Sequence, residues 1–164
     1  MKITRDQLIE MINRGDDVRY VDTSGITDMS ELFEGNSTFN QDISGWDVSN
    51  VTEMYGMFME ADAFDQDISG WDISGVTNMN MMFCCAKSMS HDLSHWNTSK
   101  SVMTESMFDG AYNYIYVSEW IQKFDHSMNE LEEAFGTDVS DLLGNVSIDQ
   151  MNSTLKAYYD NVKT

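Results

Sequence analysis

Apolar and polar positions recur along the middle of the chain with a period of 25 residues. The segment 39–63 reads FNQDISGWDVSNVTEMYGMFMEADA, and the segment 64–88 repeats it with identity at 15 of 25 positions. A more divergent copy follows at 89–113, and the second half of a copy precedes the pair at 21–38. A unit of this length is too short to bury its own apolar face, so the units are expected to stack on one another.

Alignment of the copies places apolar residues in columns, and these columns predict the core. Because each apolar position recurs in successive copies, we expect its members to pack against one another inside the array. The columns are Phe39, Phe64 and Met89; Val18, Ile43, Ile68 and Leu93; Val21, Trp46, Trp71 and Trp96; Ile26, Val51 and Val76; Met29, Met54 and Met79; Leu32, Met57, Met82 and Met107; and Phe33, Phe58, Phe83 and Phe108.

The spacing of apolar residues inside one unit predicts the secondary structure of each coil. Residues 43–54 reproduce the leucine-rich pattern L-x-x-L-x-L, which predicts a short strand at 46–48 with Trp46 inward and Asp47 outward. Residues 52–58 have apolar spacings of three and four, which predict one or two helical turns. The predicted fold class is therefore an α/β solenoid of leucine-rich-repeat-like strand-helix coils with one parallel sheet. Its strands are expected to be centred near Asp22, Asp47, Asp72 and Asn97.

The pattern FNQDISGWDVSNVTxMxxMF closely resembles the BspA-like surface-protein repeats, a branch of the leucine-rich repeat superfamily found in bacterial lipoproteins and in phage-encoded proteins. The resemblance covers residues 17–110, or about four coils. It implies a non-enzymatic interaction scaffold. It names no partner, because the defining residues of the family are those that build the coil.

The ends of the chain depart from this period and are predicted to be caps. Thr4 and Gln7 form a capping box before an apolar stripe that stops ahead of Gly15, which predicts a short helix over the first coil. After residue 113, apolar residues fall at helical spacing. The predicted division is an N-terminal helical cap at 1–16, a solenoid at 17–113 and a helical C-terminal cap or subdomain at 114–164. The apolar stripe of this last region is expected to be core, with docking of a partner or of a second copy as the alternative.

Length and composition fit one compact domain of 164 residues. No segment approaches the roughly 18 apolar residues of a membrane span, and charges interrupt the amino terminus where a signal peptide would be apolar. The only cysteines, Cys84 and Cys85, are adjacent and cannot join distant coils, which favours a reducing compartment. We therefore predict a cytoplasmic protein, in the host cytoplasm if phage-encoded. An extracellular location is the alternative, because a mature secreted fragment would look the same.

Charge is the second informative feature of the chain. It carries 28 acidic and 9 basic side chains, and between Arg19 and Lys87 there is no Lys or Arg against 12 Asp or Glu. This stretch predicts one continuous anionic surface. The period aligns the acids into two columns, which are Asp17, Asp42, Asp67 and Asp92, and then Asp22, Asp47 and Asp72. At the ~4.8 Å spacing of strands, neighbouring carboxylates repel by about 0.9 kcal/mol even in water.

The two acidic columns invite different explanations. Asp42 and its equivalents precede a Ser-Gly or similar pair, where an aspartate accepts hydrogen bonds from backbone amides two residues on and holds a turn. We expect that structural role for the first column. Asp47 and its equivalents are expected to project from a strand, where like charges destabilise a sheet. For this second column, a solvated acidic surface and recognition of a positively charged partner remain as alternatives.

An anionic surface of this extent repels nucleic acid and anionic lipid and favours Lys/Arg-rich proteins. We predict a non-enzymatic protein-binding scaffold, specifically a phage-type inhibitor of a host defence or nucleic-acid-handling protein that acts through the anionic solenoid face as a DNA mimic. The alternative is an extracellular adhesion or surface-display module. The predicted partner is a basic protein surface, without direct binding of nucleic acid or membrane. The predicted contact residues are Asp22, Asp47, Asp72, Asp42 and Asp67.

Catalytic and metal chemistry find little support in the sequence. The paired carboxylates recur in every repeat instead of marking one site, so no enzyme, catalytic residue or cofactor is predicted. A zinc site is the best metal candidate, and we reject it because adjacent cysteines are a poor chelate; its residues are Cys84, Cys85, His91 and His95. A calcium loop between Asp125 and Glu133 is also rejected, because Glu130 stands where the turn glycine is required.

Overall fold

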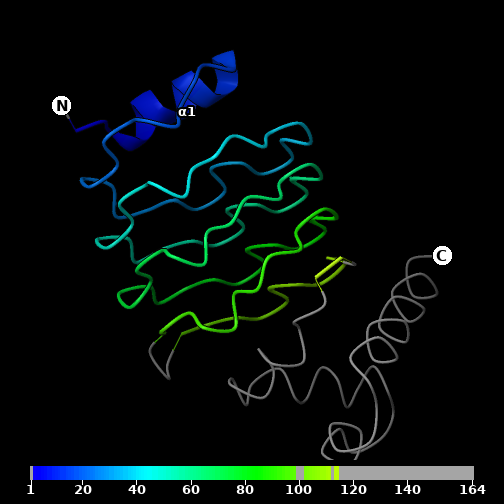
Figure 1. Cartoon of the computed structure of the whole chain (residues 1–164). Helices are drawn as coiled ribbons and strands as arrows, with labels where there is room; N and C mark the ends of the chain where they lie inside the picture. The colour runs from blue at the N-terminus through cyan, green and yellow to red at the C-terminus, as the bar shows by residue number, and fades with distance from the viewer. Residues whose placement is uncertain (1, 99–101, 112, 115–164) are drawn as a thin grey trace, which may run out of the picture.

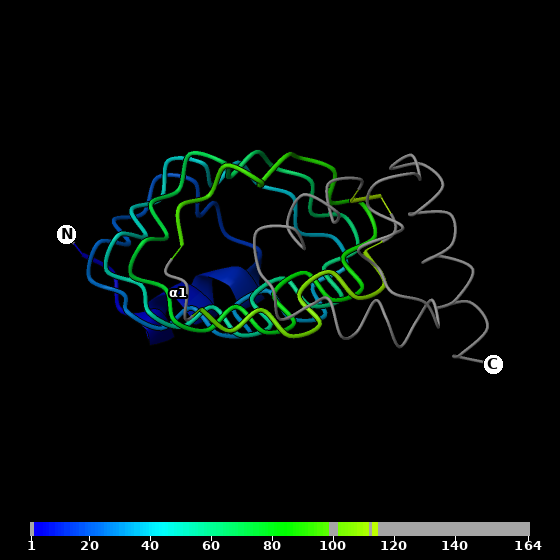
Figure 2. The same cartoon turned by 90° about the horizontal axis from the view of Figure 1, so that it is seen from below.

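The chain winds in successive turns, here called coils, which lie on top of one another (Figure 1). The computed structural model describes residues 2–98, 102–111 and 113–114. Helix α1 (Arg5–Arg14) lies across the N-terminal end of the stack. Seen along the stack in Figure 2, the described coils superimpose as a flattened ring. The predicted helical C-terminal cap at 114–164 lies, apart from Tyr114, outside the described residues.

Helix α1 begins at the predicted capping box. Thr4 Oγ1 accepts a hydrogen bond from the Gln7 N–H at 3.2 Å, and Gln7 Oε1 accepts one from the Thr4 N–H at 3.0 Å. Gly15 ends the helix in the left-handed conformation, with φ 73°. Leu8 and Ile12 are buried in the main core cluster. The helix therefore covers the apolar end of the first coil, as a terminal repeat requires.

The predicted α/β solenoid with a parallel sheet is wrong. Within the described residues α1 is the only helix, and the chain forms isolated parallel bridges instead of strands. These bridges join Lys2 to Asp22, Asp28 to Glu53, Glu53 to Asn78, and Asn78 to Met103. Of the predicted strand centres only Asp22 takes part, and its partner is the N-terminal Lys2. The bridges between successive coils thus lie six residues after the predicted strand centres.

Residues 46–48 lie between two turns, at 44–45 and 49–50, in which polar groups are engaged locally. The Trp46 N–H donates to the Ile43 carbonyl at 3.0 Å, which closes the four-residue turn 43–46. The Asp47 carboxylate accepts the Ser49 N–H at 3.1 Å. Each backbone N–H makes one strong hydrogen bond, so groups bound inside the coil are withdrawn from a ladder between coils.

The predicted helical turns at 52–58 are also wrong, because this segment carries the backbone bonds between coils. From Met54 to Glu60 every second N–H donates to the next coil, and the N–H groups of Met57 and Met59 donate three residues back within the coil. The bonds to the next coil run from Met54 to Asn78, from Gly56 to Asn80 and from Phe58 to Met82, at 2.8–3.0 Å. We call residues 28–35, 53–60, 78–85 and 103–110 the ladder face, and residues 17–26, 42–51, 67–76 and 92–98 the turn face.

Two columns of left-handed residues produce this alternation on the ladder face. The positive φ angles recur at the same two places in each coil, four residues apart. The first column is Glu31, Gly56, Met81 and Ser106, and the second is Gly35, Glu60, Cys85 and Gly110, all with φ between 52° and 69°. Five of these eight residues are not glycine, although the left-handed region favours glycine. The stack therefore imposes a conformation that the residues themselves do not prefer.

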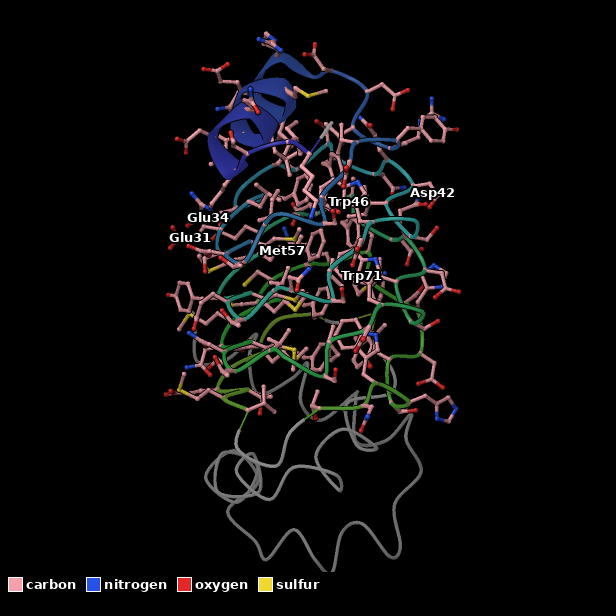
Figure 3. The ribbon with its side chains drawn as sticks, turned by 90° about the vertical axis from the view of Figure 1, so that its left-hand side faces the viewer. Glu31, Glu34, Asp42, Trp46, Met57 and Trp71 are labelled. Atoms are coloured by element: carbon pink, nitrogen blue, oxygen red, sulfur yellow. The ribbon has the colours of Figure 1, made fainter. Side chains whose placement is uncertain are left out.

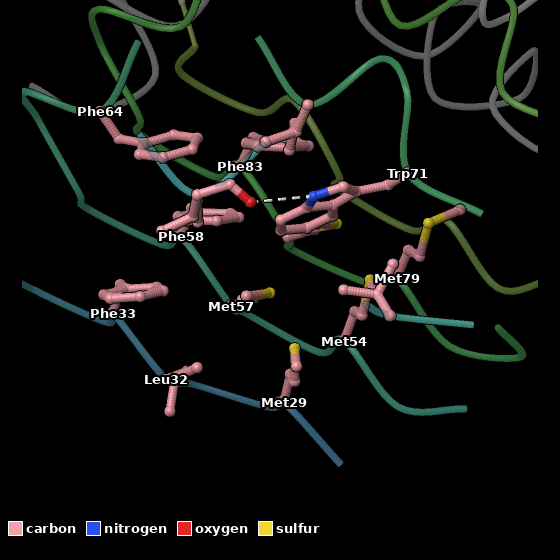
Figure 4. Close-up of a cluster of buried hydrophobic side chains, with 14 of the residues drawn as sticks. Met29, Leu32, Phe33, Met54, Met57, Phe58, Phe64, Trp71, Met79 and Phe83 are labelled. Atoms are coloured by element: carbon pink, nitrogen blue, oxygen red, sulfur yellow. Dashed lines mark hydrogen bonds between the residues drawn. The ribbon is translucent and has the colours of Figure 1, made fainter. Parts of the chain in front are cut away.

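The prediction of a core built from the aligned apolar columns is confirmed. All of its described members are buried except Val21 and Phe108, which are partly buried and pack against the core. Phe33, Phe58 and Phe83 stack one above another, with ring centroids 5.3 and 5.5 Å apart (Figure 4). Trp46, Trp71 and Trp96 are also buried, and each indole packs near the phenylalanine thirteen residues before it.

Candidate protein-binding surface

Two Asp-x-Ser turns follow each other on the turn face of a coil. Asp42 Oδ1 accepts hydrogen bonds from the Ser44 N–H at 3.0 Å and from its hydroxyl at 2.7 Å. Asp47 Oδ1 accepts the corresponding pair from Ser49 at 3.1 and 2.6 Å. The same two bonds form in the pairs Asp22 and Ser24, Asp67 and Ser69, and Asp72 and Ser74.

The structural role predicted for the Asp42 column is therefore confirmed, and it extends to the Asp47 column. The prediction that Asp47 projects from a strand is wrong, because its carboxylate bonds to Ser49 in a turn. The signal that identifies its role is the motif Asp-x-Ser, which occurs twice within DISGWDVS and DISGWDIS. Aspartate bonds of this kind hold turns in competition with regular secondary structure.

The same hydrogen bonds keep the carboxylates ionised. The hydroxyl of the serine two residues on lowers the pKa of Asp42, Asp47, Asp67 and Asp72 below the ordinary value, and the serine N–H adds to this effect. All four side chains are exposed. The turn face therefore presents fixed negative charge at neutral pH.

Among the described residues, Arg and Lys side chains compensate this charge at the N-terminal end of the turn face. The Arg19 guanidinium lies 2.7 Å from Asp17 and, chiefly through its hydrogen bond, lowers the pKa of Asp17 to about 2. Lys2 acts more weakly on the pKa of Asp47, and His91 makes a small contribution to the lowered pKa of Asp67. Within the described part of the chain, no cation contributes to the pKa shift of Asp72. The charge of Asp72 is thus left for solvent or a partner to balance.

A column of small residues runs between the two acidic columns. Gly45 and Gly70 occupy it in the middle coils, and a Cβ at either position would meet nothing within 4 Å. Tyr20 takes the equivalent place in the first coil, where its side chain is 86% exposed and the Arg19 guanidinium carbon lies 5.3 Å from its ring centroid. Tyr20 was not among the predicted contact residues; its signal is an aromatic residue at the position that Gly45 and Gly70 occupy in the two middle coils and His95 occupies in the coil after them. Exposed aromatic residues are common anchors at protein interfaces.

The acidic side chains of the basic-free stretch lie at more than one edge of the coils. Figure 3 shows Glu31 and Glu34 at one edge of the coils and Asp42 at the opposite edge, with Trp46 and Trp71 between them. The ladder face and the turn face therefore each carry acids of their own. All five predicted contact residues belong to the turn face.

The described residues contain no group of three or more His, Cys, Asp or Glu side chains placed to hold a metal ion. Of the rejected zinc candidates, Cys84 Sγ is 3.8 Å from Cys85 Sγ, and His91 Nε2 is 3.6 Å from Asp65 Oδ1. None of the described helices is long and apolar enough to span a membrane.

The recurring core columns and turns define a repeat protein with a strongly acidic surface. The chain belongs to the family described as "Mycoplasma protein of unknown function, DUF285", which matches residues 6–120, more than half of its length. No curated protein and no solved structure matches the chain. The family match is compatible with the BspA-like resemblance at the level of the family. It lends no support to the phage-inhibitor or DNA-mimic hypotheses.

Proposed function

We propose that this protein is a non-enzymatic binding module of the surface-repeat type, and that its turn face binds a Lys/Arg-rich segment of another protein. The observation that carries the proposal is the pair of ionised aspartate columns, Asp42 with Asp67 and Asp47 with Asp72, on either side of the glycine column. This proposal keeps the predicted partner chemistry and adopts the surface-display alternative for the biological role.

The geometry of the Asp-x-Ser turns favours ligand binding through the second carboxylate oxygen. In Asp42 and Asp47 both serine bonds use Oδ1, so Oδ2 remains to accept a hydrogen bond from a ligand. The serine bonds also hold each carboxylate in place before binding, which reduces the entropy lost on association. Charge-assisted hydrogen bonds to guanidinium or ammonium groups are stronger than neutral ones.

The glycine column lets an extended basic segment approach the backbone. Because a Cβ at Gly45 or Gly70 would point into open space, no side chain separates the two acidic columns there. Tyr20 stands at the N-terminal end of the column, where its exposed ring offers a face for an apolar or cationic side chain. A partner segment with alternating basic residues and one aromatic or arginine anchor fits this arrangement.

The resemblance to BspA-like surface repeats favours display outside the cell, where a module of this kind serves adhesion. The cytoplasmic location predicted from the amino terminus and from Cys84 and Cys85 stays a prediction. The inhibitor hypothesis makes a distinct prediction, because duplex DNA would then compete with Asp47 and Asp72 for the basic surface of the partner.

The binding proposal is tested by a variant that removes the aspartate charges and preserves the turns. Asparagine keeps an oxygen acceptor for the serine, so the variant Asp42→Asn, Asp47→Asn, Asp67→Asn, Asp72→Asn is expected to retain the fold. A fluorescent Lys/Arg-rich peptide should bind the wild-type protein, lose affinity as salt rises because the Debye length is only about 8 Å at physiological ionic strength, and bind the variant much more weakly.

The matched control neutralises acids on the opposite face, by Glu31→Gln, Glu34→Gln, Glu53→Gln and Glu60→Gln. Both variants change the net charge equally. A long-range electrostatic effect would therefore weaken peptide binding in both variants, whereas a local site on the turn face would lose affinity only in the asparagine variant. Equal losses in the two variants, or full binding by the asparagine variant, would contradict the proposal. The peptide should also be displaced by an unlabelled basic protein.

A further inference from the structure

We infer that Cys84 and Cys85 form a binding site for a soft metal ion of low coordination number, with Cu(I) as the ion that fits best. Both side chains are thiols, and their Sγ atoms lie 3.8 Å apart. Both residues are half-buried on the ladder face, so an ion in solution can reach them. The site is separate from the aspartate columns and does not depend on the proposed function.

The backbone of the ladder face brings the two sulfur atoms together. Neighbouring side chains of an extended chain point to opposite faces, but Cys85 is left-handed with φ 59°. The N–H of Cys84 donates to Met81 within the coil at 3.0 Å, and the N–H of Cys85 donates to Asp109 in the next coil at 2.6 Å. The dithiol is thus held by hydrogen bonds in two directions before any ion binds.

The surroundings of Cys85 leave room for its sulfur atom. A Cβ at Gly110 would lie only 2.9 Å from Cys85 Sγ, so the glycine of the next coil makes room for the sulfur atom.

The number of ligands selects the ion. Structural zinc takes four ligands, whereas Cys84 Sγ and Cys85 Sγ, 3.8 Å apart, supply two. Soft thiolates prefer Cu(I), an ion that two sulfur ligands satisfy. On binding, two S–H bonds break, two Cu–S bonds form, two protons pass to solvent, and copper remains in the Cu(I) state.

The test is an anaerobic titration of the reduced full-length chain with Cu(I) held by a chromophoric chelator. One Cu(I) per chain should leave the chelator for the wild-type protein, and Cys84→Ser or Cys85→Ser should each abolish this uptake. The control is Met59→Leu, which removes a neighbouring sulfur atom from the same face. Unchanged uptake by the double serine variant would overturn the inference by assigning copper to the methionines. A lack of uptake by the wild-type protein would overturn it as well. One Zn(II) per chain that depends on both cysteines would overturn the choice of ion.

A second measurement needs no substitution and therefore stands even if a serine variant misfolds. Phenylarsine oxide bridges two thiols with loss of one water, so the native protein should gain one phenylarsenic group and lose both titratable thiols. The adduct should resist excess monothiol and be reversed by a dithiol. Two reactive thiols that form no bridged adduct would show that the sulfur atoms cannot share one ion.

Discussion

The indole N–H of Trp71 donates a hydrogen bond to the backbone carbonyl of Ile43, 3.2 Å away in the preceding coil (Figure 4). The same bond links Trp46 to Val18 at 2.9 Å and Trp96 to Ile68 at 3.1 Å. These tryptophans therefore join the coils on the turn face, where the backbone ladder of the predicted sheet is missing. The bonds are buried, which makes an unsatisfied carbonyl costly there.

Trp71 is expected to stabilise the fold both through the volume of its side chain and through the hydrogen bond of its indole N–H. Trp71→Ala should lower the free energy of unfolding by about 3 to 5 kcal/mol, because it leaves a cavity in the middle of the stack. Trp71→Phe keeps an aromatic ring but leaves the Ile43 carbonyl without its donor, at a cost of about 1 to 3 kcal/mol. Urea unfolding measures both. A loss below about 1 kcal/mol for the alanine variant would contradict the buried placement.

The carboxylate of Asp47 is expected to stabilise the fold through its turn. Asp47→Asn keeps an acceptor for the Ser49 N–H and hydroxyl, whereas Asp47→Ala removes it; both remove the same charge. The alanine variant should therefore have the lower urea midpoint. Equal midpoints for the two variants would show that the turn bonds contribute nothing to stability, and the pair Asp72→Asn and Asp72→Ala offers an independent repeat.

The Asp-x-Ser turns also predict how stability depends on pH. A carboxyl group with a lowered pKa in the folded state binds fewer protons there than in the unfolded chain. It therefore stabilises the fold above the unfolded pKa of about 3.9, and this contribution is lost as pH falls through the folded pKa. The pKa values of Asp42, Asp47, Asp67 and Asp72 are all lowered, chiefly by serine hydroxyls.

Urea midpoints between neutral and acidic pH measure this contribution. The matched variant replaces Ser44, Ser49, Ser69 and Ser74 with alanine. This change raises the pKa values of the four aspartates toward the ordinary value and leaves the net charge of the protein at neutral pH unchanged. Its stability relative to wild type should be lowest at neutral pH, and the difference should shrink in acid. A difference that is independent of pH would mean that the serines act only through neutral hydrogen bonds.

The left-handed residues of the ladder face are expected to carry strain. Glu60 has φ 57° and is exposed. Glu60→Gly should be neutral or stabilising by up to about 1 kcal/mol, and Glu60→Val should be destabilising by about 1 to 2 kcal/mol, because a branched Cβ is disfavoured in this region. Both changes remove the same charge.

Glu34 provides the control, since it is exposed on the same face with no positive φ. Glu34→Gly is expected to destabilise by roughly 0.5 to 1 kcal/mol, as glycine does where no special conformation is required. Thermal or urea unfolding compares the three variants. Destabilisation of similar size by Glu60→Gly and Glu34→Gly would contradict the strain argument.

The pattern of side chains by itself determined which residues form the core and where helix α1 begins. A 25-residue period can be satisfied only if equivalent apolar residues meet, so Phe33, Phe58 and Phe83 stack whatever the backbone does between them. Thr4 and Gln7 form their capping box from local contacts alone. The five aspartates proposed to contact a partner are likewise exposed as predicted, because no apolar column includes them.

Only the tertiary structure decided where hydrogen bonds join the coils, since the apolar spacing at 43–58 fits several backbone paths. The choice depends on left-handed φ angles at Glu31, Glu60, Met81, Cys85 and Ser106, which these residue types do not prefer and which stacking enforces. It also depends on competition for backbone groups. The Trp46 N–H donates to Ile43 within its own coil and so does not pair with a neighbouring coil, and the indole of Trp71 rather than its backbone reaches the coil before it.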